Sequence, residues 1–290
     1  MKTLKTTRLS YSDILPLTCS RSGMCCHGNQ VWINPWEINQ LANSKNITPK
    51  AFCDTYTDFG GNRLKFEGKA NTTGKKSCLL YDDQQGCSVH IGRPLACRMY
   101  PLGRQIQSGE THYIYQGEEF PCFKECPEVK NLPQLSVQEY LVGQQSSNYE
   151  LGQAYYLEIV QNLADNAFAL LLDTPLATSG DRQTLAYWRK LGNLDPNNLY
   201  QSLDKNWIED LNYPPIESSS DPFEFTTIHN EYLQQKIQNT FETYSTLEEL
   251  QEGSSKLMAM ALYLALGIGA DIREFATHWI EIAKSNGALE

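Results

Sequence analysis

Residues 19–27 read Cys-Ser-Arg-Ser-Gly-Met-Cys-Cys-His, a run that places three cysteines and one histidine within nine positions. Thiolates hold a metal only where several of them converge on one point, at about 2.3 Å from it. Gly23 can supply the positive-φ turn that folds such a short loop. Cys25 and Cys26 are adjacent, so either both serve one centre through a sharp turn, or one ligates while the other packs or serves a second centre.

Cys78 and Cys87 form a second block of possible ligands. Between them, residues 82–86 read Asp-Asp-Gln-Gln-Gly, which is typical of a hairpin turn between two short strands. We therefore expect the two cysteines to lie near each other on opposing strands, as in a ribbon-like metal site.

Cys97 is the centre of a third block, in which residues 93–101 read Arg-Pro-Leu-Ala-Cys-Arg-Met-Tyr-Pro. Pro94 fixes a helical φ and predicts one helical turn with Cys97 about one turn inside it. Arg93 and Arg98 flank this thiol. We predict that they bind the cofactor indirectly, by offsetting thiolate charge or by donating hydrogen bonds to sulfur.

Cys122 and Cys126 form a fourth block, whose CxxxC spacing suits two ligands on one helical turn. Pro127 follows Cys126, as a proline follows a cysteine in bacterial ferredoxin-type cluster motifs. Cys53 lies inside an expected helix and is interpreted as a core residue. The histidines considered as nitrogen ligands are His27, His90 and His112, with His27 preferred because it adjoins Cys26.

The nine cysteines all precede residue 127, and charge divides at about the same place. Residues 1–133 carry 16 Lys+Arg and 12 Asp+Glu, a balance of +4, whereas residues 134–290 carry 8 and 22, a balance of −14; the two sum to the net charge of −10. A mildly basic surrounding suits clustered thiolates. The acidic balance argues against nucleic acid as a partner.

Residues 1–17 lack the apolar stretch of a secretory signal, so we expect a cytoplasmic protein. Cytosolic thiols stay reduced, and clustered reduced cysteines are typical of metal ligands or redox centres. No apolar run reaches about 18 residues, which excludes a membrane span. The longest apolar run, residues 257–270, is interpreted as a buried helix.

The predicted fold class is α+β. Residues 1–133 form an irregular, cysteine-rich, metal-binding domain with short strands, packed on a mainly α-helical domain of residues 134–290. Glycine and proline punctuate the first part, where we expect strands at 31–33 and 113–115 and helices at 35–43 and 48–56. In the second part, Ser136 and Glu139 match a capping box, and the apolar periodicity predicts helices at about 181–191, 197–211, 226–244, 246–268 and 271–285.

The first three blocks together, Cys19-x-x-Ser22-Gly23-x-Cys25-Cys26, Cys78-x₈-Cys87 and the run from Arg93 to Pro101, resemble a family of cysteine-cluster proteins described as zinc- or iron-chelating. The resemblance covers about residues 17–103. Many members have cysteine where this chain has Ser22, and Cys122 and Cys126 could compensate for it. The family includes flagellin lysine methylases, so the resemblance implies an iron–sulfur-dependent methyl-transfer or redox enzyme.

Three hypotheses remain open at this point. In the first, the thiols hold an iron–sulfur cluster in a redox or transferase enzyme. In the second, they hold zinc in a structural or interaction module without catalysis, and in the third they bind no metal and act in redox sensing. The partner would be a protein or a small-molecule substrate, with no nucleic acid and no membrane. The predicted metal ligands are Cys19, Cys25, Cys26, Cys78, Cys87, Cys97, Cys122 and Cys126.

Overall fold

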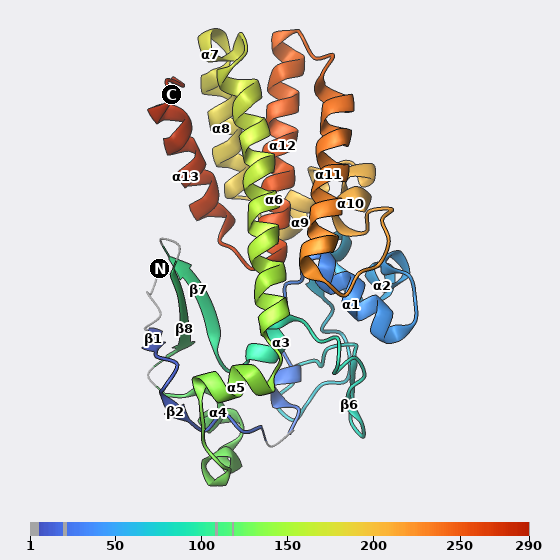
Figure 1. Ribbon diagram of the computed structural model, residues 1–290, viewed down its shortest axis with the longest axis vertical. Coiled ribbons are helices and arrows are strands. Elements are labelled where there is room, and N and C mark those ends of the chain that lie inside the picture. The colour runs from blue at the N-terminus through green and yellow to red at the C-terminus, as the bar shows by residue number, and fades with distance from the viewer. Residues whose placement is uncertain (1–5, 20–21, 108–109, 118, 290) are drawn as a thin grey trace. The chain divides into compact units, whose positions relative to one another are not determined.

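The computed structural model describes residues 6–19, 22–107, 110–117 and 119–289. The chain has an α+β fold of short antiparallel strands and many helices (Figure 1). It divides into two units, which we call the cysteine unit (residues 1–31 and 65–150) and the helical unit (residues 32–64 and 151–290). Within the described residues, no helix combines the length and apolarity needed to cross a membrane.

The cysteine unit consists of short elements. Its largest sheet is antiparallel in the order β1-β8-β7, and β2 pairs with β9 and β5 with β6. Its elements are β1 (Thr6–Leu9), β2 (Ile14–Leu15), η1 (Met24–Cys26), β5 (Tyr81–Asp82), β6 (Gly86–Cys87), α3 (Leu95–Met99), β7 (Gly103–Gln107), β8 (Glu110–Gln116), α4 (Pro121–Glu125), η3 (Pro127–Asn131), β9 (Leu135–Ser136) and α5 (Val137–Gly143). The strand expected at 113–115 is confirmed as part of β8, and the capping box of Ser136 and Glu139 starts α5 as predicted.

The helical unit is organised around α12, whose residues from Leu257 to Gly267 are all buried, so the predicted buried helix is confirmed. Helices α8, α9, α10 and α13 contact it. The elements of this unit are α1 (Pro35–Lys45), α2 (Pro49–Tyr56), β3 (Thr57–Asp58), η2 (Phe59–Gly61), β4 (Arg63–Leu64), α7 (Leu176–Ser179), α8 (Asp181–Gly192), α9 (Pro196–Gln201), α10 (Lys205–Asn212), α11 (Pro222–Phe241), α12 (Leu247–Gly267) and α13 (Ile272–Ser285). Helix α6 (Ser147–Leu172) contains the point at which the two units are divided.

Residues 32–64 belong with the helices because buried hydrogen bonds tie them there. The Asn62 side chain donates to the carbonyl of Tyr263 at 2.6 Å, and the Tyr263 hydroxyl donates to the carbonyl of Phe59 at 2.6 Å. Asn212 donates to the carbonyl of Gly60 at 2.9 Å. The domain boundary predicted at residue 133 stays a prediction. The sequence did not indicate that residues 32–64 belong to the helical unit or that residues 134–150 belong to the cysteine unit.

Most predicted helices are confirmed, including α1 with its Asn34 cap and α13 with its Asp271 cap. The strand expected at 31–33 is wrong, since only Trp32 makes an isolated bridge there. The single helix expected at 197–211 is also wrong, because α9 ends at Gln201 and α10 begins after Asp204. The helix expected at 226–244 begins earlier, at Pro222, where the Asp221 side chain caps the N–H of Phe223 at 3.0 Å.

Candidate metal centre

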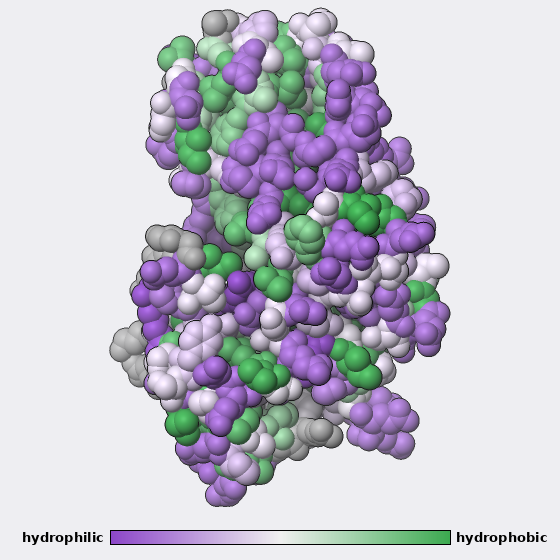
Figure 2. Space-filling view, viewed as in Figure 1, coloured by the Kyte–Doolittle hydropathy of each residue, from purple (hydrophilic) through white to green (hydrophobic). Residues whose placement is uncertain are grey.

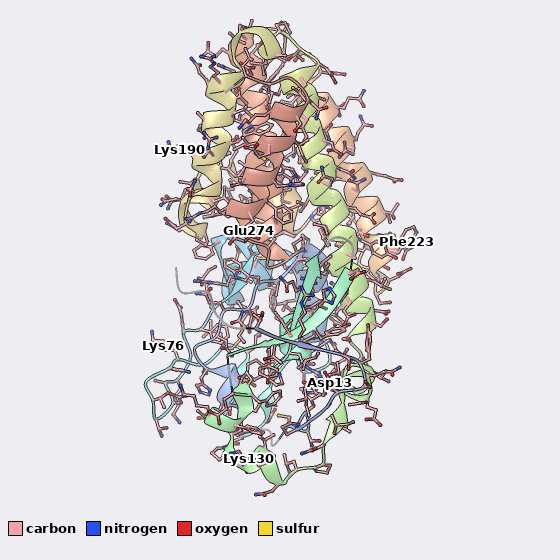
Figure 3. The ribbon with its side chains drawn as sticks, turned by 90° about the vertical axis from the view of Figure 1, so that its left-hand side faces the viewer. Asp13, Lys76, Lys130, Lys190, Phe223 and Glu274 are labelled. Atoms are coloured by element: carbon pink, nitrogen blue, oxygen red, sulfur yellow. The ribbon has the colours of Figure 1, made fainter. Side chains whose placement is uncertain are left out.

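The first and second cysteine blocks are joined by backbone pairing. The N–H of Cys78 donates to the carbonyl of Cys26 at 2.8 Å, and that of Gly28 donates to the carbonyl of Lys76 at 2.9 Å. Lys76 is labelled in Figure 3. Each pair of atoms spans about fifty residues of chain, so this ladder places η1, with Cys25 and Cys26, next to Cys78.

Gly23 allows η1 to fold against Tyr81. Its φ is +73°, and a Cβ at this position would collide with the Tyr81 ring, so both the backbone conformation and the available space favour glycine. Burial raises the pKa of the Tyr81 hydroxyl, and the negative charges of Asp83, Cys26 and Cys25 raise it further. Tyr81 is therefore an electrostatic neighbour of the adjacent cysteines.

The predicted hairpin between Cys78 and Cys87 is confirmed. Strands β5 and β6 pair with Tyr81 opposite Cys87 and Asp82 opposite Gly86. Cys78 lies just before β5 rather than within it, yet it remains close to Cys87. Burial raises the pKa of the Cys78 thiol to about 11, and the nearby charge of Cys87 contributes to this rise.

Arg93 connects the hairpin to the third block. Burial and the charge of Arg98 lower its pKa, whereas the thiols of Cys97 and Cys87 raise it, so both thiols lie within electrostatic reach of this guanidinium. Arg93 donates to the carbonyl of His90 at 2.5 Å and to the Gln144 side chain at 2.6 Å. Cys97 lies on α3, the single helical turn predicted after Pro94, and its side chain is exposed.

Arg98 binds carbonyl groups instead of sulfur. It is 3% exposed and donates to the carbonyls of Arg93 at 2.9 Å, Gln144 at 2.8 Å and Ile91. Its guanidinium also lies over the ring of Tyr149, 3.9 Å from the centroid. It thus ties the segment before α3 to the C-terminal end of α5. The role predicted for both arginines at a cofactor stays a prediction.

The Tyr140 hydroxyl lies within electrostatic reach of thiols from the first and fourth blocks. Burial raises the pKa of this hydroxyl, the charges of Cys19 and Cys122 raise it next, and Cys25 adds a smaller contribution. The hydroxyl donates to the carbonyl of Tyr100 at 2.6 Å, at the end of the third block. The first, third and fourth blocks therefore approach one buried tyrosine. Sequence reasoning missed this residue because its local pattern indicates only a helix.

The fourth block folds as its spacing predicts, with both cysteines on one turn. The N–H of Cys126 donates to the carbonyl of Cys122 at 2.8 Å at the end of α4. The Sγ of Cys126 lies 2.8 Å from the Oγ of Ser22, which is 104 residues away along the chain. Cys126 therefore lies next to Ser22, the position at which the family resemblance leads us to expect a cysteine.

The structure also shows the surroundings of Cys53 and of the three candidate histidines. Cys53 is confirmed as a core residue: it is 4% exposed on α2, and burial raises its pKa to about 12. His27 is buried, with Nδ1 hydrogen-bonded to the carbonyl of Gly23 at 2.9 Å and its ring 5.1 Å from that of Tyr81. His90 contacts Arg93, and His112 lies 3.6 Å from the Glu110 carboxylate.

The donor set has the chemistry of a soft-metal site, because thiolates favour zinc, copper(I) and iron–sulfur clusters. Among the described residues, no three Cys, His, Asp or Glu side chains are grouped closely enough to hold one metal ion as they stand. Each cysteine has three staggered χ1 positions, so rotation about χ1 changes where its thiol points. The eight predicted ligands stay a prediction as a set.

Comparison with known proteins identifies the class of this part of the chain. Residues 18–120 match the family model CxxCxxCC, described as "Putative zinc- or iron-chelating domain". This match confirms the family resemblance of the cysteine blocks and supports metal binding by this segment, with zinc and iron as the alternatives. No curated protein and no solved structure matches the chain.

Proposed function

We propose that the cysteine unit holds an iron–sulfur cluster, ligated from among Cys19, Cys25, Cys26, Cys78, Cys87, Cys97, Cys122 and Cys126. The observation that carries this proposal is that distant cysteine blocks are paired. The Cys78 N–H donates to the carbonyl of Cys26 at 2.8 Å, and the Cys126 Sγ lies 2.8 Å from the Ser22 Oγ. Cys87 and Cys97 both lie within electrostatic reach of Arg93. Such a cluster supplies one-electron redox chemistry, and the family resemblance adds methyl transfer to a lysine as a second reaction class. A reducing cytosol would keep these thiols available.

The contact between Ser22 and Cys126 supports a ligand set adapted to this sequence. Where related chains carry cysteine at position 22, this chain carries a serine whose Oγ meets the Cys126 Sγ at 2.8 Å. In the proposed centre, Cys126 supplies the missing thiolate, and Ser22 donates a hydrogen bond to its sulfur. Hydrogen bonds to ligating sulfur tune the potential of a cluster.

Arg93 and Tyr140 would affect the centre without ligating the metal themselves. The Arg93 guanidinium offsets the negative charge of the nearby Cys87 and Cys97 thiolates. Tyr140 positions the end of the third block through its hydrogen bond to the Tyr100 carbonyl.

Zinc is the second candidate, and the β5–β6 hairpin favours it. Hairpins that bring two cysteines together are typical of ribbon-like tetrahedral sites, and Cys78 and Cys87 are electrostatic neighbours here. Eight thiols are enough for two such sites. In that case the cysteine unit would be a structural or interaction module without catalysis.

Anaerobic purification of the full chain tests the proposal. An iron–sulfur cluster gives absorbance at about 400 nm together with iron and acid-labile sulfide, whereas a zinc module is colourless with stoichiometric zinc. Cys97→Ser and Cys126→Ser should lose most of the metal, and the matched control Cys53→Ala should keep it. Wild-type metal content in Cys97→Ser, or a metal-free wild-type protein, would contradict the proposed centre.

A further inference from the structure

A groove of about 680 Å³ runs along the helical unit between α6, α11 and α12. Its floor is apolar, with Leu170, Phe241 and Leu257 among the residues that line it. The sides are dominated by side-chain amides, from Asn166 on α6 and from Asn230, Gln234, Gln235 and Gln238 on α11. Figure 2 shows hydrophilic residues gathered over the surface of these two helices. No cysteine is among the residues that line the groove, so it plays no part in the proposed metal centre.

One amide in the groove is only half-satisfied. Oε1 of Gln234 accepts a hydrogen bond from Asn166 at 2.9 Å, whereas Nε2 of Gln234 is buried and has no hydrogen-bond partner. A buried donor without a partner costs about 1–3 kcal/mol, so the structure contains a site where an incoming carbonyl oxygen would be stabilised. This unsatisfied donor is the observation that points to a ligand.

The amides are spaced like the backbone groups of an extended polypeptide. Asn230, Gln234 and Gln238 follow one another at intervals of four residues, which is about 6 Å along a helix. In an extended chain, like-facing backbone groups recur every two residues, at about 6.6 Å. The carbonyl oxygens of Asn230 and Gln234 already accept hydrogen bonds from Asn162 and Asn166 on α6, at 3.2 and 2.9 Å, so the N–H groups of these two side chains face an incoming chain as donors. They match the C=O groups that recur along one edge of an extended peptide.

The charged residues that line the groove are Glu231 and Glu242, both acidic. They lie toward opposite ends of the α11 segment, about 16 Å apart along the helix, a span that about five extended residues cover. We propose that this groove binds an extended polypeptide segment of a partner protein, with the amide row pairing its backbone and the two glutamates binding lysine or arginine side chains.

Fluorescence anisotropy with the full-length protein tests this assignment. The probe is a fluorescein-labelled, amidated peptide of sequence Gly-Ala-Lys-Ala-Ala-Ala-Ala-Lys-Ala-Gly, whose two lysines are five residues apart to match the span between the glutamates. It is compared with the same peptide carrying glutamate at both lysine positions. We expect saturable binding of the lysine peptide, about tenfold or weaker binding of the glutamate peptide, and weakening as salt rises from about 50 to 200 mM. Maltohexaose and spermidine serve as competitors that represent a carbohydrate and a small polyamine.

Two variants separate the roles of the amides and the charges. Gln234→Met keeps the length of the side chain but removes the amide, and it should weaken binding about tenfold. The double variant Glu231→Gln, Glu242→Gln changes only the charge and should remove most of the preference for lysine. Glu248→Gln, an exposed charge change on α12, is the matched control and should bind as wild type. Circular dichroism confirms that each variant is folded.

Unchanged binding in both groove variants would overturn the proposal, as would a wild-type protein that ignores the lysine peptide at millimolar concentration. Binding of maltohexaose or spermidine in place of the peptide would equally overturn it. None of these outcomes depends on the metal content of the cysteine unit, so failure here is distinguishable from failure of the proposed metal centre.

Discussion

The helical unit and the cysteine unit stabilise their folds by different means. In the helical unit, α12 is buried over eleven consecutive residues, from Leu257 to Gly267, and its neighbours contribute large side chains such as Trp188 and Trp279 that are at most 1% exposed. Burial of apolar area at about 25 cal/mol per Å² stabilises such a core without any ligand. The cysteine unit instead contains two-residue strands and helices of five residues.

The position of the thiols sharpens this contrast. The helical unit contains one cysteine, Cys53, and it is packed in the core. The other eight lie in the cysteine unit, where Cys19 and Cys97 are exposed and the rest are half-buried. Exposed and half-buried thiols add little apolar stabilisation. From their concentration in the unit with the shortest elements, we infer that a bound metal would take the place of a larger core there.

Removal of the metal should produce the largest effect, and only in one unit. Structural zinc sites contribute about 10–16 kcal/mol of apparent binding free energy that is also folding free energy. Anaerobic chelation should therefore abolish amide protection in β8 and α5 of the cysteine unit while α12 stays protected. Hydrogen exchange of the full chain, read by mass spectrometry on peptides from each unit, measures this difference. Equal loss of protection in both units would remove the distinction between them.

Acid should act on the helical unit through His229. This residue is fully buried, with Nδ1 at 2.9 Å from the Tyr156 hydroxyl and Nε2 at 2.9 Å from the carbonyl of Asp210. Burial lowers its pKa from 6.5 to about 4. Between these values the unfolded state binds more protons than the folded state, so stability is full above pH 6.5 and falls by about 3 kcal/mol as the pH drops to 4.

Urea unfolding of the wild type and of His229→Gln across this pH range isolates the histidine. Other groups that face this region include Tyr232 and Lys236, both bound to Asp210, and they are common to both proteins. Subtracting the two stability curves cancels their contribution and that of the cysteines. A difference that stays constant from pH 7 to pH 4 would show that His229 titrates normally in the folded chain.

Sequence reasoning succeeded where structure depends on neighbours along the chain. The caps at Asn34, Thr48 and Asp271 lie where their side chains reach N–H groups two or three residues away, and the hairpin turn at 82–86 is equally local. These features need only propensity and spacing. The same reasoning failed at 31–33, where an apolar run serves burial rather than strand pairing.

What could not be predicted depends on contacts between distant residues. Asn62 reaches the carbonyl of Tyr263 across 201 residues, and Ser22 meets Cys126 across 104. Tyr140 follows the predicted boundary at residue 133, yet Cys19 and Cys122 lie within electrostatic reach of its hydroxyl. No local pattern distinguishes such a tyrosine from an ordinary helical core residue. The candidate ligands could therefore be named from the sequence, but the residues that surround them could not.

Two glycines of the cysteine unit allow the smallest of these effects to be tested, namely whether a local loss of stability there also costs metal. Gly23 and Gly74 both have positive φ, +73° and +79°, and an added Cβ would collide with Tyr81 at the first but meet nothing within 4 Å at the second. Placing an alanine in the left-handed region costs about 1 kcal/mol. Gly74→Ala should lose about that much stability and keep its metal, because the turn it changes is in open space.

Gly23→Ala should cost about 2 kcal/mol and lower the metal content as well, because Tyr81 must shift and η1 moves with Cys25 and Cys26. Thermal unfolding and metal analysis on the same samples separate the two effects. Equal metal content in the two variants, despite a larger loss of stability in Gly23→Ala, would mean that η1 can move without disturbing the ligands. Cys25 and Cys26 would then have to be removed from the proposed set.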